Sequence, residues 1–149
     1  MTDIPPISVQ LLSDPKYLCG VRELVAAVAG RLGFSEEECG QIKLAVDEAL
    51  CNIVRHGYQR RKDGQIWISL SPICNGQDVT QLRIVIEDEA RQVDPRTIKG
   101  RDLADIRPGG LGVHIIREIM DEVVYEKREP TGMRLTLVKT RCSCPASKP

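Results

Sequence analysis

The hydrophobic pattern at the start of the chain predicts one strand and then a helix. Apolar and polar residues alternate over residues 7–11, as in a strand with one buried face. Apolar positions then lie three or four residues apart over 18–32, the spacing of an amphipathic helix. We expect this helix to begin at Ser13-Asp14-Pro15, with proline in its first turn, and to end near Gly33.

A second helix is predicted directly after the first. Ser35 and Glu38 have the spacing of a capping box, in which each residue satisfies a backbone amide of the other. The apolar stripe that follows continues to about His56, and Gly57 is expected to end the helix.

Two strands are expected in the middle of the chain. Apolar residues alternate over 66–70 and again over 82–86. Pro72 is expected to end the first of these strands. The two strands should form a hairpin joined by a loop of several residues. Asp88 continues the alternation of the second strand, so its side chain should lie on the core side, where a carboxylate is costly unless another group satisfies it.

The last part of the chain combines a long irregular stretch with regular elements. Residues 89–110 show little periodicity, which is typical of a functional or disordered loop. A helix is expected over 111–120, followed by strands over 123–125 and 133–137. The end of the chain, from Cys142 to Pro149, is expected to be disordered.

This order of elements predicts a two-layer α+β sandwich. Consecutive hairpins favour a mixed, mostly antiparallel sheet, and the helices should pack on one of its faces. With 149 residues, the chain has room for one domain, with an ordered core over about 8–140 and a tail over 141–149.

Charge and composition exclude several classes of function. The chain has 21 Lys plus Arg against 21 Asp plus Glu, and its few aromatic residues are scattered, so no nucleic-acid surface is expected. No apolar run approaches the roughly 20 residues that cross a bilayer, and no signal peptide is apparent, so we expect a cytoplasmic protein that does not enter a membrane.

Three polar features could carry chemistry. Glu48 and Asn52 share one helix face, where a carboxylate and an amide can hold hydrated Mg²⁺ or orient an attacking group, although a solvated face also explains the pair. Asp88 could accept a hydrogen bond from a ligand amino group or simply cap the next turn. The glycines of 109–112 could let a phosphate approach a helix start, or could serve only loop flexibility.

The order of these features resembles that of the GHKL (Bergerat-fold) ATP-binding proteins. The stretch from Glu48 to Tyr58 is similar to their N-box, and Ile86–Asp88 followed by Val93–Pro95 is similar to their adenine motif. Residues 107–116 resemble the glycine motif that closes the ATP lid, and 135–139 match the last strand. The short length and the His-Gly-Tyr ending of the N-box look most like the anti-sigma-factor serine kinases.

The resemblance implies a role for each matching residue. Glu48 would be the catalytic glutamate that orients or activates a serine hydroxyl, and Asn52 would bind the Mg²⁺ that bridges the phosphates of ATP. Asp88 would accept a hydrogen bond from the adenine amino group, and Gly110 and Gly112 would let backbone amides contact phosphate.

Cationic residues complete the implied set. Arg107, with Lys99 and Arg101, lies in the lid and could meet the γ-phosphate, where positive charge assists transfer, although a solvated loop also explains Lys99 and Arg101. Arg22, on the first helix, would contact the partner protein.

One motif departs from the family pattern. The adenine motif is usually D-x-G-x-G, whereas here the residues are Asp88-Glu89-Ala90-Arg91-Gln92, so both glycines are missing. The methyl group of Ala90 could crowd the adenine, and Gln92 removes backbone freedom. This departure leaves an alternative open, which is a non-catalytic partner-switch module with a degenerate ATP site.

The leading hypothesis is an anti-sigma factor that is also a Mg²⁺-ATP-dependent protein serine/threonine kinase. It would bind a sigma factor and would phosphorylate a serine on a small anti-anti-sigma antagonist of the STAS type. The resemblance also implies a homodimer.

Overall fold

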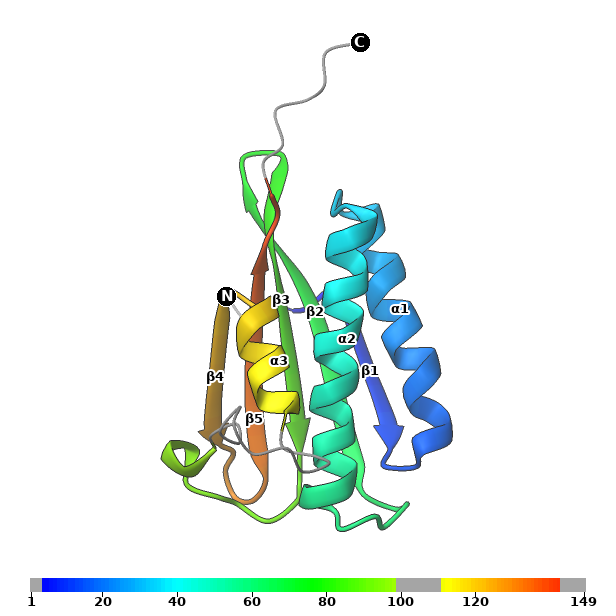
Figure 1. Cartoon of the computed structure of the whole chain (residues 1–149), viewed down its shortest axis with the longest axis vertical. Coiled ribbons are helices and arrows are strands. Elements are labelled where there is room, and N and C mark those ends of the chain that lie inside the picture. Colours follow the sequence, from blue (N-terminus) through cyan, green and yellow to red (C-terminus); the bar gives the residue numbers. More distant parts are fainter. Residues whose placement is uncertain (1–3, 99–110, 143–149) are drawn as a thin grey trace.

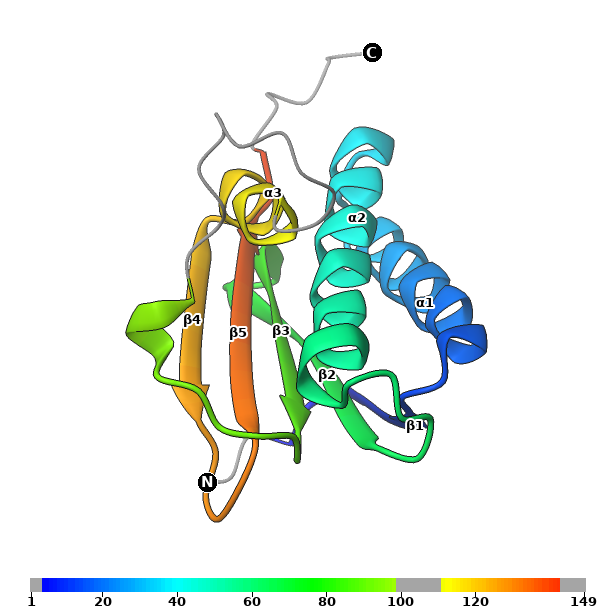
Figure 2. The same cartoon turned by 60° about the horizontal axis from the view of Figure 1, so that its bottom comes forward.

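The computed structural model describes residues 4–98 and 111–142, in which a sheet carries three α-helices on one face (Figures 1 and 2). Of the tail expected over 141–149, the structure describes Arg141 and Cys142, whose amides are hydrogen-bonded to Thr80 and Glu38, and the rest lies outside the described residues. The elements in chain order are β1 (Ile7–Leu12), α1 (Leu18–Arg31), α2 (Glu36–Asn52), β2 (Gln65–Asn75), β3 (Asp78–Asp88), α3 (Gly112–Ile119), β4 (Glu122–Lys127) and β5 (Met133–Thr140).

The sheet has five strands in the order β1-β2-β3-β5-β4. Each of its neighbouring pairs is antiparallel, so the described sheet contains no parallel pair and is simpler than the mixed sheet that the sequence suggested. The predicted two-layer α+β architecture is confirmed, with α1, α2 and α3 covering the same face (Figure 2).

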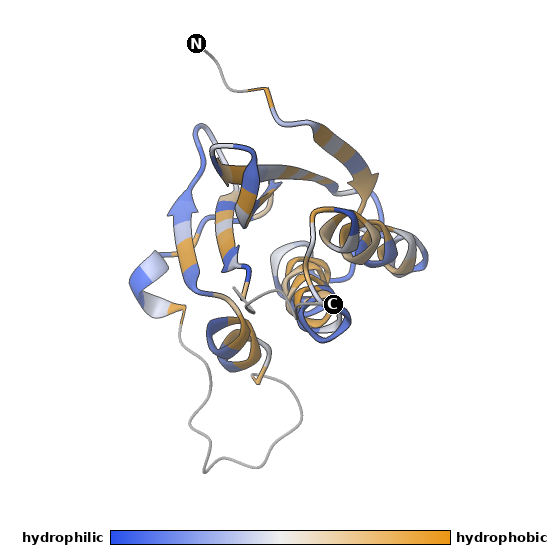
Figure 3. Cartoon of the chain, turned by 90° about the horizontal axis from the view of Figure 1, so that it is seen from above, coloured by the Kyte–Doolittle hydropathy of each residue, from blue (hydrophilic) through white to orange (hydrophobic). Residues whose placement is uncertain are grey.

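The hydrophobic alternation of the strands builds the core between the two layers. Residues on one face of each strand are buried against the apolar stripes of the helices, and the hydropathy colours show these stripes facing inward (Figure 3). The largest fully buried side chains include Val25, Ile42, Leu50, Ile66, Ile68, Leu82, Ile84, Ile86, Ile116 and Leu137.

The hairpin of β2 and β3 differs from the prediction. β2 continues through Pro72, which lies opposite Leu82, and only the two residues Gly76 and Gln77 separate it from β3. The expected strand end at Pro72 and the expected longer loop were therefore wrong. The physical reason is that β1 pairs with β2 only as far as Leu70, so Pro72 lies in an edge segment, where a missing N–H is tolerated.

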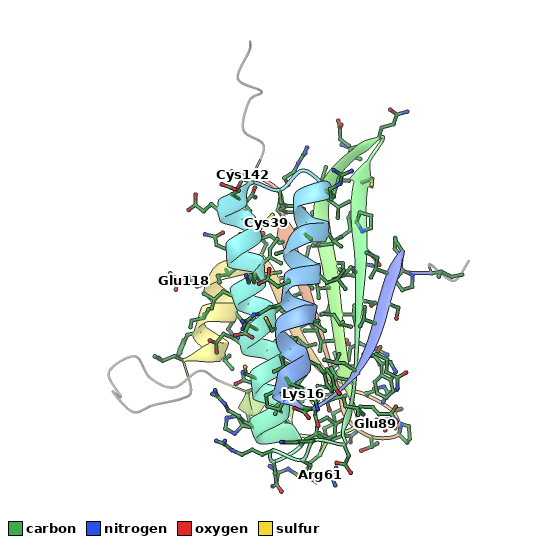
Figure 4. All side chains as sticks on the ribbon, turned by 90° about the vertical axis from the view of Figure 1, so that its right-hand side faces the viewer. Lys16, Cys39, Arg61, Glu89, Glu118 and Cys142 are labelled. Carbon is green, nitrogen blue, oxygen red and sulfur yellow. The ribbon has the colours of Figure 1, made fainter. Side chains whose placement is uncertain are left out.

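The capping box at the start of α2 is confirmed. The hydroxyl of Ser35 accepts a hydrogen bond from the amide of Glu38 at 3.1 Å, and the Glu38 carboxylate accepts one from the amide of Ser35 at 2.9 Å. The same carboxylate also accepts a hydrogen bond from the amide of Cys142 at 2.8 Å, which fastens the chain after β5 to the start of α2 (Figure 4). Burial alone would raise the pKa of Glu38, but the amides of Ser35 and Cys142 outweigh it, so the pKa lies below its ordinary value.

The other end of α2 finishes in a different way. The α-helix passes into a π-helical turn over Ile53–Gly57, in which the amide of Tyr58 bonds to the carbonyl of Ile53 at 2.8 Å. The predicted helix end at Gly57 is therefore confirmed. Such turns widen a helix locally and are frequent at functional sites.

Candidate functional site

A cavity of about 330 Å³ lies where the end of α2, the start of α3 and the inner faces of β3, β4 and β5 meet. Its volume is within the range of small-molecule sites, and its walls are mostly apolar with a few polar groups, which is also typical of such sites. The apolar lining residues are Ala49, Ile53, Ile86, Ala90, Val93, Ile98, Val113, Tyr125, Met133 and Leu135, and the polar ones are Asn52, His56, Asp88 and Arg91.

Glu48 and Asn52 lie on the side of α2 that faces the start of α3. A Cβ atom added to Gly112 would lie 2.7 Å from Oε2 of Glu48 and 3.3 Å from Nδ2 of Asn52. The two side chains predicted to share a helix face therefore converge on the first residue of α3. Glu48 stands just beyond the residues that line the cavity, whereas Asn52 and Gly112 line it directly.

The missing side chain of Gly112 leaves space beside Glu48. A Cβ atom at this position would displace the flexible end of the Glu48 side chain, so the missing Cβ leaves room for the Glu48 carboxylate in its present position. The amides of the first turn of a helix lack partners within the helix, and the helix dipole favours anions there. A carboxylate, an amide and a helix start are thus gathered at one end of the cavity.

Asp88 lies at the other end of the cavity and is 4% exposed, which confirms the predicted inward orientation. Its Oδ1 accepts hydrogen bonds from the amides of Ala90 at 2.9 Å and Met133 at 3.3 Å. Among the described residues, no such bond ends on Oδ2. Burial raises the pKa of the Asp88 carboxyl, and these two amides together with Arg128 offset only part of that effect. Asp88 therefore caps the next turn and also lines the cavity, so the two roles considered from sequence are compatible.

The turn between β4 and β5 lies directly against Asp88. Gly132 has a φ of +92°, and a Cβ atom there would lie 1.8 Å from the carbonyl oxygen of Asp88. Only glycine fits this contact, because the conflict would be with backbone rather than with a flexible side chain. Gly132 lies between β4 and β5, and its contact with Asp88 depends on the pairing of β5 with β3.

The two positions where the adenine motif lacks glycine have partners in the fold. Ala90 is buried against Gly57, where a Cβ atom would come within 3.1 Å of the Ala90 methyl group, so Gly57 provides the room that Ala90 needs. The side-chain amide of Gln92 donates a hydrogen bond to the carbonyl of Arg128 at 2.5 Å. Both substitutions are therefore accommodated by neighbouring elements.

Tyr58 joins the end of α2 to the end of β3, a contact that sequence reasoning missed. Its hydroxyl donates a hydrogen bond to the carbonyl of Gln65 at 2.5 Å and accepts one from the amide of Glu89 at 2.7 Å. Burial raises the pKa of Tyr58, so the hydroxyl remains protonated and keeps its donor. The N-box and the adenine motif are thereby fixed relative to each other.

Arg22 is not part of the cavity. It extends from α1 to Asp47 on α2, with 3.0 Å between Nη1 and Oδ1, in a small hollow lined also by Gly40, Lys43 and Leu44. Nε of Arg22 is buried without a hydrogen-bond partner among the described residues. The other predicted residues of the lid, Lys99, Arg101, Arg107 and Gly110, lie outside the described residues.

Residues 11–139 match the family model of the histidine kinase-like ATPase domain, and the chain belongs to this family. Among its relatives, serine-protein kinase RsbW of Listeria innocua is 31% identical over 137 residues, which cover 87% of this chain and 85% of the relative. Serine-protein kinase RsbW of Bacillus subtilis is 28% identical over 139 residues, with 87% and 83% covered. The family inferred from the motifs is thus confirmed.

The fold also matches a solved structure. The RsbU and RsbW domains of Rv1364c from Mycobacterium tuberculosis superimpose with a TM-score of 0.62 at 18% identity, over 93% of this chain and 33% of that longer chain. At this identity the match supports the fold alone.

Proposed function

We propose that this protein is an ATP-dependent serine-protein kinase whose nucleotide site is the cavity between α2, α3 and the sheet. The observation that carries the proposal is the convergence of Asn52, Asp88 and Gly112 on this one cavity, with Glu48 beside Gly112. The names of its relatives support the same activity.

The adenine is proposed to lie in the apolar part of the cavity, next to Asp88. Ile53, Ile86 and Leu135 provide apolar walls for a planar base. Because the described bonds of Asp88 both end on Oδ1, its Oδ2 is the acceptor for the adenine amino group. An ionised carboxylate accepts hydrogen bonds more strongly than a neutral one, so binding should weaken as Asp88 becomes protonated.

The phosphates are proposed to lie at the Asn52 and Gly112 end. The first turn of α3 favours an anion, and the amide oxygen of Asn52 is a ligand type that Mg²⁺ accepts. Among the described residues there is no cluster of three or more acidic, His or Cys side chains that could hold a metal ion alone. This fits Mg²⁺ shared between ATP and one or two protein oxygens, which would neutralise charge on the phosphates. Gly110 and Arg107 are proposed to contribute from the lid.

Glu48 is proposed to act on the serine of the substrate protein. The serine oxygen forms a bond to the γ-phosphorus while the bond from that phosphorus to the bridging oxygen of ADP breaks, and the serine proton passes to the Glu48 carboxylate. This role is supported by the position of Glu48, whose Oε2 lies beside Gly112 and just outside the residues that line the cavity.

The partner surface is proposed to lie on the α1 side of α2, around Arg22. The guanidinium group already pairs with Asp47, and its buried Nε is an unused donor among the residues described. A carboxylate of the partner could take the place of Asp47. By the sequence resemblance, the partners are a sigma factor and a STAS-type anti-anti-sigma protein, and the protein acts in the cytoplasm as a homodimer.

The decisive experiment measures transfer of labelled phosphate from ATP to the cognate antagonist. The parent should transfer phosphate and Glu48→Ala should not, while both bind ATP with similar affinity in calorimetry. If Glu48→Ala remains active, the assigned role is wrong. If the parent binds its partners but transfers no phosphate, the protein is the non-catalytic module that the missing glycines suggested.

A further inference from the structure

Arg128, in the turn between β4 and β5, makes contacts that converge on the end of β3. Its Nε lies 2.8 Å from the Glu87 carboxylate, and its Nη1 lies 3.6 Å from that of Glu89. Nη1 also lies 3.4 Å from the carbonyl oxygen of Asp88. The guanidinium group therefore reaches three consecutive residues, of which the middle one is the proposed adenine acceptor.

The rest of the Arg128 side chain and its backbone are also engaged. The guanidinium group lies 4.7 Å from the centre of the Trp67 ring, a cation–π contact that fixes its plane. The amide of Arg128 bonds to the carbonyl of Gly132 at 2.9 Å, which closes the turn, and its carbonyl accepts from Gln92. Arg128 thus joins β2, β3, the β4–β5 turn and the adenine loop, which is the segment 89–92 that follows β3.

We propose that Arg128 is a positioning residue for nucleotide binding, which holds the β4–β5 turn against the end of β3 so that Asp88 keeps one carboxylate oxygen for its ligand. Met133, the first residue of β5 after this turn, supplies the amide that bonds to Oδ1, and Gly132 in the turn allows the close approach. The claim that Arg128 assists nucleotide binding rests on the proposed function. The claim that Arg128 positions the Asp88 carboxyl does not.

Arginine suits this role better than lysine would. Its planar fork donates in several fixed directions and stacks on an aromatic ring, whereas an ammonium group is a single strongly hydrated charge. The adenine loop lacks both usual glycines, and its Gln92 is instead tied to the backbone of Arg128. The contacts of Arg128 therefore hold the adenine loop in place, although this loop lacks the usual glycines of its motif.

The charge of Arg128 also acts on Asp88. The titratable groups around Asp88 come from several elements: Glu87 and Glu89 on its own strand end, Tyr58 and His56 at the end of α2, Arg91 in the loop, Tyr125 on β4, and Arg128. A nearby positive charge favours the ionised carboxylate, so removal of Arg128 raises the pKa of Asp88. It also leaves Glu87 and Glu89 less neutralised, which acts in the same direction.

The test compares Arg128→Met and Arg128→Lys with Arg134→Met in the full chain. Arg134 is a matched control, because it is a second arginine that pairs with Glu87, with 3.6 Å between its Nη2 and the Glu87 carboxylate. It lies on β5, and its side chain is more exposed than that of Arg128. NMR titration of the Asp88 side-chain carbon without nucleotide should show a higher pKa of Asp88 in Arg128→Met than in the parent. Arg128→Lys keeps the positive charge, so the pKa of Asp88 in this variant should stay near the parent value. The pKa of Asp88 in Arg134→Met should also stay near the parent value.

Calorimetry with Mg-ATP gives the second measurement. Arg128→Met should bind Mg-ATP about tenfold more weakly than the parent at pH 7. As the pH is lowered, the affinity of the variant should begin to fall at a higher pH than the affinity of the parent. The proposal is overturned if Arg128→Met matches the parent in both measurements, or if Arg134→Met changes both equally. If the parent itself does not bind Mg-ATP, the proposed function fails, and the NMR comparison still decides whether Arg128 controls the Asp88 carboxyl.

Discussion

The two sides of α2 place neighbouring carboxylates in opposite settings. Asp47 faces α1 and pairs with Arg22 at 3.0 Å, whereas Glu48 faces α3 and lies beside Gly112. Consecutive helix residues point about 100° apart, so adjacent positions serve different surfaces. Among the described residues, no cation pairs with Glu48. The comparison shows how one helix can keep one carboxylate engaged at a proposed partner surface and another available for proposed chemistry.

Glu48→Gln should have the largest effect and should be confined to the α3 side. It removes the proton acceptor, so the rate of phosphate transfer should fall by about 10² to 10⁴ at saturating ATP and partner. Quench-flow or gel assays with labelled ATP measure the rate. Asp47→Asn, one residue away, should leave the saturated rate near that of the parent; an equal loss in both variants would remove the distinction between the two sides.

Gly112→Ala tests whether the space at the start of α3 serves Glu48. The new methyl group would meet Oε2 of Glu48 at 2.7 Å, and the flexible end of that side chain would have to move. Displacement of a catalytic group by about 1 Å can cost about 10² in rate, so kcat should fall by that order while the melting temperature changes little. The control is Gly40→Ala on α2, the helix that carries Glu48, where a Cβ atom meets nothing within 4 Å. A normal kcat in Gly112→Ala would count against the assigned geometry.

Asp88→Asn should separate nucleotide recognition from structure. The amide oxygen of Asn can still accept from Ala90 and Met133, but its NH₂ group would face the adenine amino group, donor to donor. ATP affinity should fall by about 10- to 100-fold in calorimetry, with no loss of stability, because the buried charge is removed. In the parent, ATP affinity should fall as the pH falls through the raised pKa of Asp88, and this dependence should disappear in Asp88→Asn.

Arg22→Ala should affect the α1 side alone. Truncation of a central interface arginine typically costs about 2 kcal/mol, or roughly a 30-fold loss of affinity, and we expect that loss for the sigma factor or the antagonist. Titration by biolayer interferometry measures it. ATP affinity should remain that of the parent, and a loss of ATP binding in this variant would show that the two surfaces are not independent.

Glu38→Gln should have the smallest effect and should touch neither surface. The pKa of Glu38 is lowered in the folded state, so its ionised form stabilises the fold above the unfolded-state pKa of about 4.3, and this contribution is lost as the pH falls through the folded-state value. The variant should lose about 1 kcal/mol of unfolding free energy at pH 7 in urea titrations. The difference should vanish at acidic pH; a constant difference would mean that charge is not its cause.

Local pattern predicted the elements and the α2 side of the site well. The capping box at Ser35, the helix end at Gly57, the shared face of Glu48 and Asn52, and the inward Asp88 all follow from spacing within one element. The contacts that were missed join elements far apart in the chain. Gly132 and Arg128 reach Asp88 only because β5 inserts between β3 and β4, which no local pattern encodes. The predicted strand end at Pro72 was wrong for the same reason. A proline is tolerated within β2 only because β1 stops pairing with β2 before Pro72.

The strand order has a consequence for how the protein is made. β5 is the last strand in the chain but lies between β3 and β4, and its pairing with β3 runs from Arg134 to Thr140. Ile86 of β3 and Leu135 of β5 both line the cavity, so a growing chain has no complete cavity until the start of β5 has left the ribosome. The proposed binding of ATP to this cavity would then stabilise only the finished fold, by mass action.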